Sequence, residues 1–301
     1  MKTDFCDKTF HRMNPPIRNG NNALTGIYRN IPIAFKKTSK IRNFKVKRAI
    51  ISDIHANLEA LQAVMEDIEK QNVNEIICLG DVIGYGANPL ECLDIVIQKC
   101  QKCLLGNHEL GALFDPEGFN GSAARAIFWT REQLQAPSER RDERWEFINM
   151  NPRKYYLEDW KALFVHGSPR NPLNEYVFSD EVYEGSKKIE MLFNIITHVC
   201  FQGHTHIPGV FTQDHRFLSP DEINYELDLQ PDLKYMINVG SVGQSRDGIA
   251  KACYVTVEEK ENGVLHLVYH RVEYSNQTAA EKIYQISAID QFQGDRLLSG
   301  R

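Results

Sequence analysis

The chain has 301 residues, of which 42% are hydrophobic and 25% are charged, the balance of an ordinary globular protein with a sizeable core. Its formal net charge of −5 hides an uneven distribution, because residues 1–48 carry twelve Lys and Arg against two Asp. The longest apolar runs, such as residues 76–79 and 162–165, are too short to span a bilayer, and residues 1–20 lack the apolar stretch of a secretory signal. We therefore expect a cytoplasmic protein with no membrane partner.

The basic N-terminal residues admit two interpretations. A basic arm on an acidic body can contact nucleic acid or an anionic surface. The segment lacks a repeating aromatic and basic pattern, which favours a poorly ordered extension. We predict a basic extension over residues 1–45 and a single domain over 46–301 that includes a C-terminal helical tail.

Seven cysteines are an odd number in a chain of this length and indicate reduced thiols in a cytosolic protein. Cys100 and Cys103 have the spacing of a redox or zinc motif, but no second pair with that spacing accompanies them. We expect them to serve in packing.

Short apolar runs that alternate with helical patterns predict an α/β fold with parallel strands. Five of these runs are each followed closely by a polar side chain. The runs cover residues 48–51, 76–79, 103–105, 163–165 and 199–202, and the side chains that follow them are Asp53, Asp81, Asn107, His166 and His204. Because parallel strands end at one edge of a sheet, we expect these five side chains to converge there.

The segments between and after these strands show helix and hairpin signals. Asn57 is expected to cap one helix, Asn88 to cap another that has Pro at its first position, and residues 122–134 to form a third. Later, Asn262 and Gly263 predict a hairpin turn between strands. The expected hairpin strands cover 252–257 and 264–272, and a final helix is expected from Thr278 onward.

Half of the ten histidines belong to the same recurring context, directly after apolar runs. They are His55, His108, His166, His204 and His206. Carboxylate and imidazole together are ligands for zinc, iron, manganese and similar ions. Two such ions need a bridging carboxylate, for which Asp81 is the natural candidate.

The chain resembles the calcineurin-like metallophosphoesterase superfamily, and in local text its small bacterial phosphodiesterase and phosphatase branch. The resemblance rests on SDIHANLEAL, CLGDVIGYGANPLEC, the GNHE tetrapeptide, FVHGSPRNPL, QGHTHIP and NVGSVGQSRDG, and it runs from about Val46 to Val272. Asn57 departs from the pattern, because Gly is frequent at that position. The resemblance implies a four-layer α-β-β-α sandwich of two mixed sheets.

The resemblance also implies a role for each matched residue. Asp53, His55 and His206 hold a first metal ion, Asp81 bridges, and Asn107, His166 and His204 hold a second ion. The ions are divalent or transition metals, namely Mn, Fe, Zn or Ni. A hydroxide that bridges them attacks phosphorus in line, while His108 protonates the leaving oxygen as general acid. Glu109 is expected to orient His108, and Asn107 to contact the substrate. Apart from the resemblance, Arg246 lies in the loop 240–246 and is a candidate for contacting a substrate phosphate.

Several alternatives stay open from the sequence. Arg246 is equally well interpreted as a loop arginine that forms surface ion pairs. A catalytically weak regulatory scaffold could keep the same fold, although all seven expected ligands are present. A nucleic-acid-directed phosphodiesterase tethered by the basic arm is a further alternative. The motifs do not choose between a phosphorylated small molecule, a nucleotide and a phosphoprotein as substrate, and they predict no oligomeric state.

Overall fold

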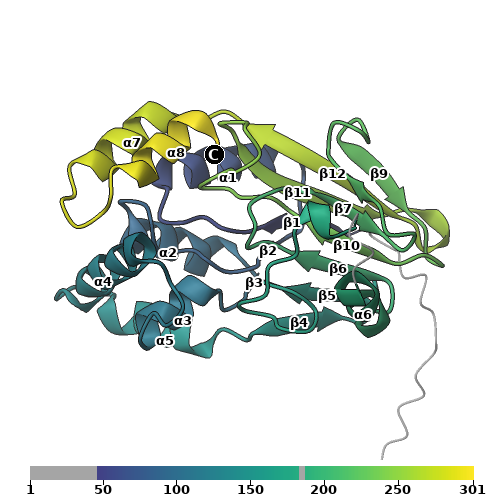
Figure 1. Cartoon of the computed structure of the whole chain (residues 1–301), viewed down its shortest axis with the longest axis horizontal. Helices are drawn as coiled ribbons and strands as arrows, with labels where there is room; N and C mark the ends of the chain where they lie inside the picture. Colours follow the sequence, from purple (N-terminus) through teal and green to yellow (C-terminus); the bar gives the residue numbers. More distant parts are fainter. Residues whose placement is uncertain (1–45, 183–186) are drawn as a thin grey trace, which may run out of the picture. The chain divides into compact units, whose positions relative to one another are not determined.

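Two six-stranded mixed sheets pack face to face, and helices cover their outer faces (Figure 1). The computed structural model describes residues 46–182 and 187–301, so the predicted N-terminal extension lies outside the described residues. The architecture is the predicted α-β-β-α sandwich. Within the described ranges, no helix is both long enough and apolar enough to cross a bilayer.

Each sheet contains a parallel group of three strands next to antiparallel strands. The first sheet has the order β3 (Lys102–Cys103), β2 (Glu75–Cys78), β1 (Lys47–Ile51), β11 (Ala252–Glu259), β12 (Leu265–Val272), β9 (Glu226–Leu229). The second has the order β4 (Lys154–Leu157), β5 (Ala162–Val165), β6 (Val199–Gln202), β10 (Tyr235–Asn238), β7 (Gly209–Thr212), β8 (Phe217–Leu218). The strands β1 to β3 run parallel, as do β5, β6 and β10. In each sheet, the carboxyl ends of these three parallel strands therefore lie at the same edge, where the loops that follow them begin.

Apolar side chains fill the space between the sheets and explain the buried strands. Ile50 and Ile77 of the first sheet belong to one buried cluster with Phe164 and Phe201 of the second. The two phenylalanine rings stack with their centroids 5.0 Å apart. Fully burying a side chain of this size stabilises the fold by about 1.5–3 kcal/mol, so this interface fixes how the two sheets face each other.

Helices cover the outer face of the first sheet. They are α1 (Leu58–Lys70), α2 (Pro89–Lys99), α3 (Asn107–Leu113), α4 (Gly121–Gln135) and α5 (Arg141–Met150). In the described residues, the second sheet is covered by α6 (Lys187–Ile195) and the short 3-10 helix Ser179–Val182. Asn57 caps α1 as predicted, because its side chain accepts from the Ala60 amide at 3.1 Å. It also donates to the Gly243 carbonyl at 2.7 Å, so it ties the start of α1 to a distant loop.

Two local predictions about strand and helix ends need correction. The strand expected over 103–105 is only the two residues of β3, because the chain leaves the sheet before the GNHE turn. Asn88 makes no capping hydrogen bond; its side chain instead donates to Glu91 and accepts from Lys282. Pro89 does occupy the first turn of α2 as expected.

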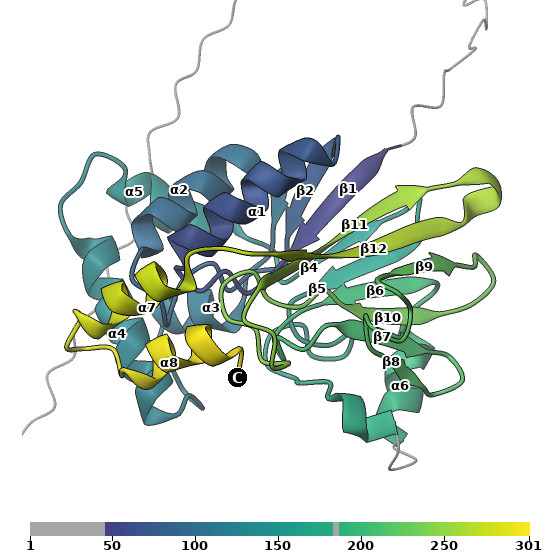
Figure 2. The same ribbon diagram turned by 90° about the horizontal axis from the view of Figure 1, so that it is seen from above.

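The single C-terminal helix that the sequence suggested is in fact two. The helices α7 (Asn276–Tyr284) and α8 (Phe292–Ser299) pack on each other, with Ile283, Ile289 and Leu297 in a shared buried cluster. Residues 285–291 reverse the chain so that both apolar faces are covered. Figure 2 shows this yellow pair next to α1, with which α7 is in contact.

The cysteines of the described ranges are free and mostly buried. Burial raises the pKa of the Cys100 thiol, and a contact with Cys78 together with burial raises that of Cys103. Both side chains pack in the cluster between the first sheet and its helices. A neutral buried thiol is a small hydrophobic group, which agrees with the packing role expected for this pair.

Candidate metal centre

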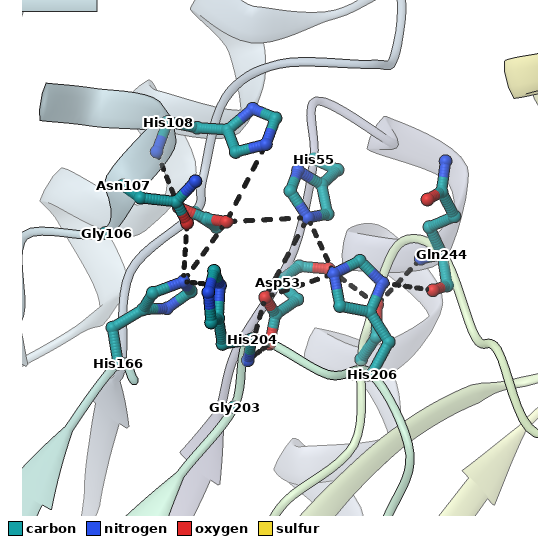
Figure 3. A network of polar contacts seen from close by, with 12 residues as sticks. Asp53, His55, Gly106, Asn107, His108, His166, Gly203, His204, His206 and Gln244 are labelled. Atoms are coloured by element: carbon teal, nitrogen blue, oxygen red, sulfur yellow. Dashed lines mark hydrogen bonds and ion pairs between the residues drawn. The ribbon is translucent and has the colours of Figure 1, made fainter. Parts of the chain in front are cut away.

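The seven expected ligands lie together where the parallel strands of both sheets end, and Figure 3 shows all of them by label except Asp81. Asp53, Asp81 and Asn107 follow β1, β2 and β3, whereas His166 and His204 follow β5 and β6. In Figure 3, His166 and His204 lie on one side of Asp53, and His55 and His206 lie on the other. The five strand ends thus converge as the sequence predicted.

The first cluster consists of Asp53, His55 and His206. The two Nε2 atoms of His55 and His206 are 3.1 Å apart. Asp53 Oδ1 lies 3.3 Å from Nε2 of His206 and 3.8 Å from Nε2 of His55. All three side chains are buried, so solvent does not separate them.

Backbone carbonyls determine which nitrogen of each ring carries the proton. Nδ1 of His55 lies 3.2 Å from the Ile83 carbonyl, and Nδ1 of His206 lies 2.5 Å from the Gln244 carbonyl. A carbonyl oxygen only accepts, so both Nδ1 atoms donate and both Nε2 atoms present lone pairs. Two lone pairs facing each other at 3.1 Å repel unless a cation lies beside them. This is how carbonyls orient histidine ligands around metals, and the residues fit a metal ion.

The second cluster consists of Asp81, Asn107, His166 and His204. Nε2 of His166 lies 3.0 Å from Asn107 Oδ1, 3.1 Å from His204 Nδ1 and 3.2 Å from Asp81 Oδ2. The other ring nitrogens, Nδ1 of His166 and Nε2 of His204, are buried and have no hydrogen-bond partner among the described residues. Several acceptors therefore point at one spot, which again suits a cation.

Asp81 lies between the two clusters. Its Oδ2 is 3.2 Å from Nε2 of His166 and 3.7 Å from Nε2 of His55. Its Oδ1 accepts from the backbone amide of His108 at 2.9 Å. A carboxylate that reaches both donor sets has the placement that a bridging ligand requires.

The electrostatics favour ionised carboxylates and mainly neutral imidazoles. Although burial opposes it, the neighbouring imidazole of His206 holds the pKa of Asp53 well below its usual range. Burial lowers the pKa of His204 to about 3 and also lowers that of His55. His166 is the exception, because the neighbouring Asp81 outweighs burial and raises its pKa to about 9. Metal ions bind carboxylates and neutral imidazoles, so this charge state favours ligation.

The backbone at the centre is strained. Five expected ligands have a positive φ: Asp53 (54°), His55 (47°), Asp81 (52°), His204 (66°) and His206 (62°). Such a conformation costs a non-glycine residue about 1–3 kcal/mol and concentrates at functional sites. Gly203 adds to the crowding, since a Cβ there would lie 2.4 Å from Asp53 Oδ2. Bringing these side chains together therefore costs the folded state some local stability.

Glu109 does not act on the His108 ring as predicted. Its Oε1 accepts from the amides of Val82 and Ile83, and its Oε2 accepts from those of Asp81 and Gly106. These four bonds, of 2.8–3.1 Å, tie the loop after β2 to the start of α3. Burial, with the charge of Asp81, raises the pKa of Glu109 to about 7. The residue positions Asp81 and Asn107 rather than His108.

The ring of His108 lies next to the two clusters. It takes no part in the close nitrogen contacts between His55 and His206 or between His166 and His204. Its Nε2 is 4.0 Å from Asp81 Oδ2, and its ring centroid is 4.5 Å from that of Tyr85 and 5.0 Å from that of Phe119. Ligand atoms of His55, Asp81 and His108 also lie within 4.8 Å of one another. The role of His108 as general acid is a prediction from the resemblance.

Aromatic residues that the sequence did not single out line the cleft above the centre. The cleft has a volume of about 360 Å³ and is bordered by Tyr85, Phe119 and Tyr176 together with Asn107 and His204. The ring of Tyr176 stacks on that of His204 with centroids 3.8 Å apart. Tyr176 stands in the loop after β5, just past the FVHGSPRNPL text, where no motif residue marks it. Tyr85 does lie within the quoted CLGDVIGYGANPLEC text.

Arg246 lies beside the first cluster. Its guanidinium donates to the Gln244 side chain at 2.9 Å and lies 5.9 Å from the centroid of the Tyr85 ring. No carboxylate of the described chain forms an ion pair with it, so the alternative of a surface-paired arginine gains no support.

Comparison with known proteins identifies the class to which this fold and centre belong. The model of the calcineurin-like phosphoesterase superfamily domain matches residues 46–262. The chain belongs to this superfamily, whose members are hydrolases of phosphate esters that use divalent metals.

Individual relatives agree with the family. An uncharacterized protein of Methanocaldococcus jannaschii is 38% identical over 258 residues, which cover 84% of this chain and 98% of that protein. A crystal structure of a metallophosphoesterase from Sphaerobacter thermophilus is 30% identical with a TM-score of 0.69, over 85% of this chain and 100% of that one. A hypothetical protein from Pyrococcus horikoshii, 18% identical with a TM-score of 0.61 over 85% and 99%, shares the fold. Relatives from archaea and bacteria both occur, so the narrower bacterial branch stays a prediction.

Proposed function

We propose that this protein is a phosphohydrolase that cleaves phosphomonoester or phosphodiester bonds with two metal ions. Asp53, His55 and His206 hold the first ion, Asn107, His166 and His204 hold the second, and Asp81 bridges them. The observation that carries the proposal is the pair of facing Nε2 atoms of His55 and His206, whose proton-bearing nitrogens are already committed to backbone carbonyls. Among the described residues, no donor group satisfies these two nitrogen atoms, and the arrangement suits a cation.

The two ions, when bound, supply activation of water and neutralisation of phosphoryl oxygens. The chain's own residues do the rest. Asp81 sets the spacing of the two donor sets, and Asn107 borders the cleft, where its amide can donate to a phosphoryl oxygen. Tyr85 and Phe119 hold the ring of His108 at the side of the cleft. From there His108 donates a proton to the leaving oxygen, and Arg246 contributes a positive charge for the substrate.

Hydrolysis of p-nitrophenyl phosphate and bis-p-nitrophenyl phosphate by metal-loaded protein tests the proposal, and EDTA should abolish the activity. His108→Ala should retain its metals and lose about 10²- to 10⁴-fold in kcat, the usual contribution of general acid catalysis. His215→Ala, which replaces an exposed histidine outside the centre, is the matched control and should behave like wild type. Full activity of His108→Ala would show that the acid is another group, whereas loss of metal would make His108 a ligand.

The regulatory-scaffold alternative predicts a different result. A scaffold would bind metal yet hydrolyse nothing in a panel of phosphomonoesters, cyclic nucleotides, dinucleotide polyphosphates and phosphopeptides. The same panel separates monoester from diester specificity. We further propose that the protein is cytoplasmic and that its substrate is not a nucleic acid. Salt-dependent binding of RNA that requires residues 1–45 would contradict the second of these points.

A further inference from the structure

Two arginines converge on one side chain next to the metal centre. Arg246, in the loop after β10, and Arg296, on α8, donate to the same Gln244 Oε1, at 2.9 Å and 3.4 Å. Both guanidinium groups are half-buried, and the Nε atom of each is buried without a hydrogen-bond partner in the described ranges. Burial and the positive charge of Arg246 lower the pKa of Arg296. The two cations therefore lie close to each other, with no counter-charge among the described residues.

The most deeply buried arginine side chains of the described chain are neutralised by carboxylates. Arg144 forms two bonds of 2.8 Å with the carboxylate of Asp94. Arg48 pairs with Glu75 at 2.6 Å, and Arg271 pairs with Asp247. Among the residues that the structure describes, no carboxylate lies within ion-pair distance of Arg246 or Arg296. Two adjacent guanidinium groups without an acid are costly unless an external anion completes them, and their planar donor edges match phosphate.

The arginine pair is linked directly to the metal centre through Gln244. The Gln244 backbone carbonyl accepts from Nδ1 of His206, while its side-chain oxygen accepts from both arginines (Figure 3 shows Gln244 beside His206). Tyr85 provides a second link, because its ring packs 4.7 Å from that of His55 and 5.9 Å from the Arg246 guanidinium. An anion at the pair would therefore lie beside, not on, the first cluster.

Helix α8 is fixed to this loop by specific contacts. The Gly248 amide donates to the Gly300 carbonyl at 2.8 Å. Gln244 Nε2 donates to Gln293 Oε1 at 3.0 Å, which turns Gln244 Oε1 toward the arginines. The C-terminal helix thus presents Arg296 at a defined place rather than only covering the core.

We propose that Arg246 and Arg296 form a subsite for a second phosphoryl group of the substrate, beyond the one that reacts. The proposal rests on the function proposed above, since the reacting group occupies the metal centre. It names the substrate class: molecules with at least two linked phosphoryl groups, such as a diphosphate ester, are preferred over simple monophosphates. Arg296 is then a specificity-determining residue supplied by the last helix.

Calorimetric binding of two non-hydrolysable probes to the metal-loaded full chain tests this. Methylenediphosphonate carries two phosphoryl groups and methylphosphonate carries one. In Arg296→Gln, the affinity for methylenediphosphonate should fall about 10- to 100-fold, the worth of a hydrogen bond to a charged group, while the affinity for methylphosphonate stays unchanged. Bound metal ions alone can favour methylenediphosphonate over methylphosphonate. The decisive quantity is therefore the ratio of the affinity in wild type to that in Arg296→Gln, measured for each probe.

Arg125→Gln is the matched control. It removes one positive charge from an exposed arginine of α4 that pairs with Asp290, shortly before α8, and should bind both probes like wild type. Equal loss in both variants, or no loss in Arg296→Gln, would overturn the proposal. So would a methylphosphonate stoichiometry that drops from two to one in Arg296→Gln, because the pair would then be a separate site for free phosphate.

The same measurements separate this inference from the proposed function. Arg296-dependent binding of methylenediphosphonate without any hydrolysis of phosphate esters would leave the subsite standing and refute the enzyme. Hydrolysis of phosphate esters without Arg296-dependent binding of methylenediphosphonate would support the enzyme and refute the subsite.

Discussion

At the scale of single residues, the centre is held in place mainly by backbone groups. Carbonyls of Ile83 and Gln244 fix the rings of His55 and His206, and the Glu109 carboxylate gathers four amides. Side chains that are oriented by such contacts lose little freedom when a metal binds, which raises affinity.

Glu109→Gln is expected to weaken metal binding by about 10- to 100-fold, as losses of supporting contacts around metal sites usually do. The amide would turn an NH₂ group toward backbone N–H donors, and the loops of Asp81 and Asn107 would move. Chelator-competition titration measures this affinity. Glu91→Gln, at an exposed position of α2, is the control and should bind metal normally. Unchanged affinity in Glu109→Gln would show that its hydrogen bonds do not position the ligands.

Gly84→Ala is expected to reduce kcat by about 10²-fold while the metal content stays the same, because small displacements of catalytic groups have effects of that size. Gly84 has a φ of 86°, and a Cβ there would lie 2.1 Å from Nδ1 of His108. Steady-state kinetics with elemental analysis would measure both quantities.

Gly263→Ala separates displacement of His108 from backbone strain. Gly263 has a similar φ of 76°, yet a Cβ there meets only Pro231 at 3.8 Å. The control should lose stability but keep its kcat. An equal loss of kcat in both variants, or none in Gly84→Ala, would mean that the position of His108 does not govern the reaction.

At the scale of elements, the hairpin of β11 and β12 contains a partly buried histidine outside the metal centre. His270 pairs with Tyr254 across the hairpin, and their rings stack with centroids 4.6 Å apart. Burial, opposed by the charge of Asp67, lowers the pKa of His270 to about 4. The folded state therefore keeps this ring neutral at pH values where the unfolded chain protonates it.

This contact makes stability pH-dependent in a defined direction. Above pH 6.5 the ring is neutral in both states. As pH falls to 4 the unfolded state binds a proton first, so the contribution of this ring to the free energy of unfolding falls by about 3 kcal/mol. His270→Gln should lack this part of the loss, as urea unfolding at pH 7 and 4.5 would show. The exposed His215→Gln serves as control and should follow wild type; if His270→Gln also follows wild type, the ring is not held neutral.

The elements also show what the sequence can and cannot predict. Apolar runs predicted β1, β2, β5 and β6 well, since each is largely or partly buried and is followed by a ligand-type residue. The turn at Asn262 could be predicted from the sequence, because Asn tolerates the positive φ that this position adopts, 61°. The break between α7 and α8 could not be predicted in this way. It depends on the two helices packing their apolar faces against each other and against the rest of the domain. Tertiary packing, rather than local propensity, decides such boundaries.

At the scale of the whole molecule, the centre exists only where two sheets meet. The first sheet brings Asp53, Asp81 and Asn107, and the second brings His166 and His204. The order of motifs predicted that these residues gather, whereas the direction of each ring and the placement of Arg296 come from loops and a helix distant in sequence. The role of Glu109 was predicted wrongly for the same reason, since its four partners belong to loops that only the fold brings together.

The metal content of the purified chain tests the account most directly. After loading with manganese or zinc and removal of free ions, elemental analysis should find two ions per chain in wild type and in His108→Ala, and fewer in Asp81→Ala. Zero or one ion per chain in fully loaded wild type would contradict the two-metal centre.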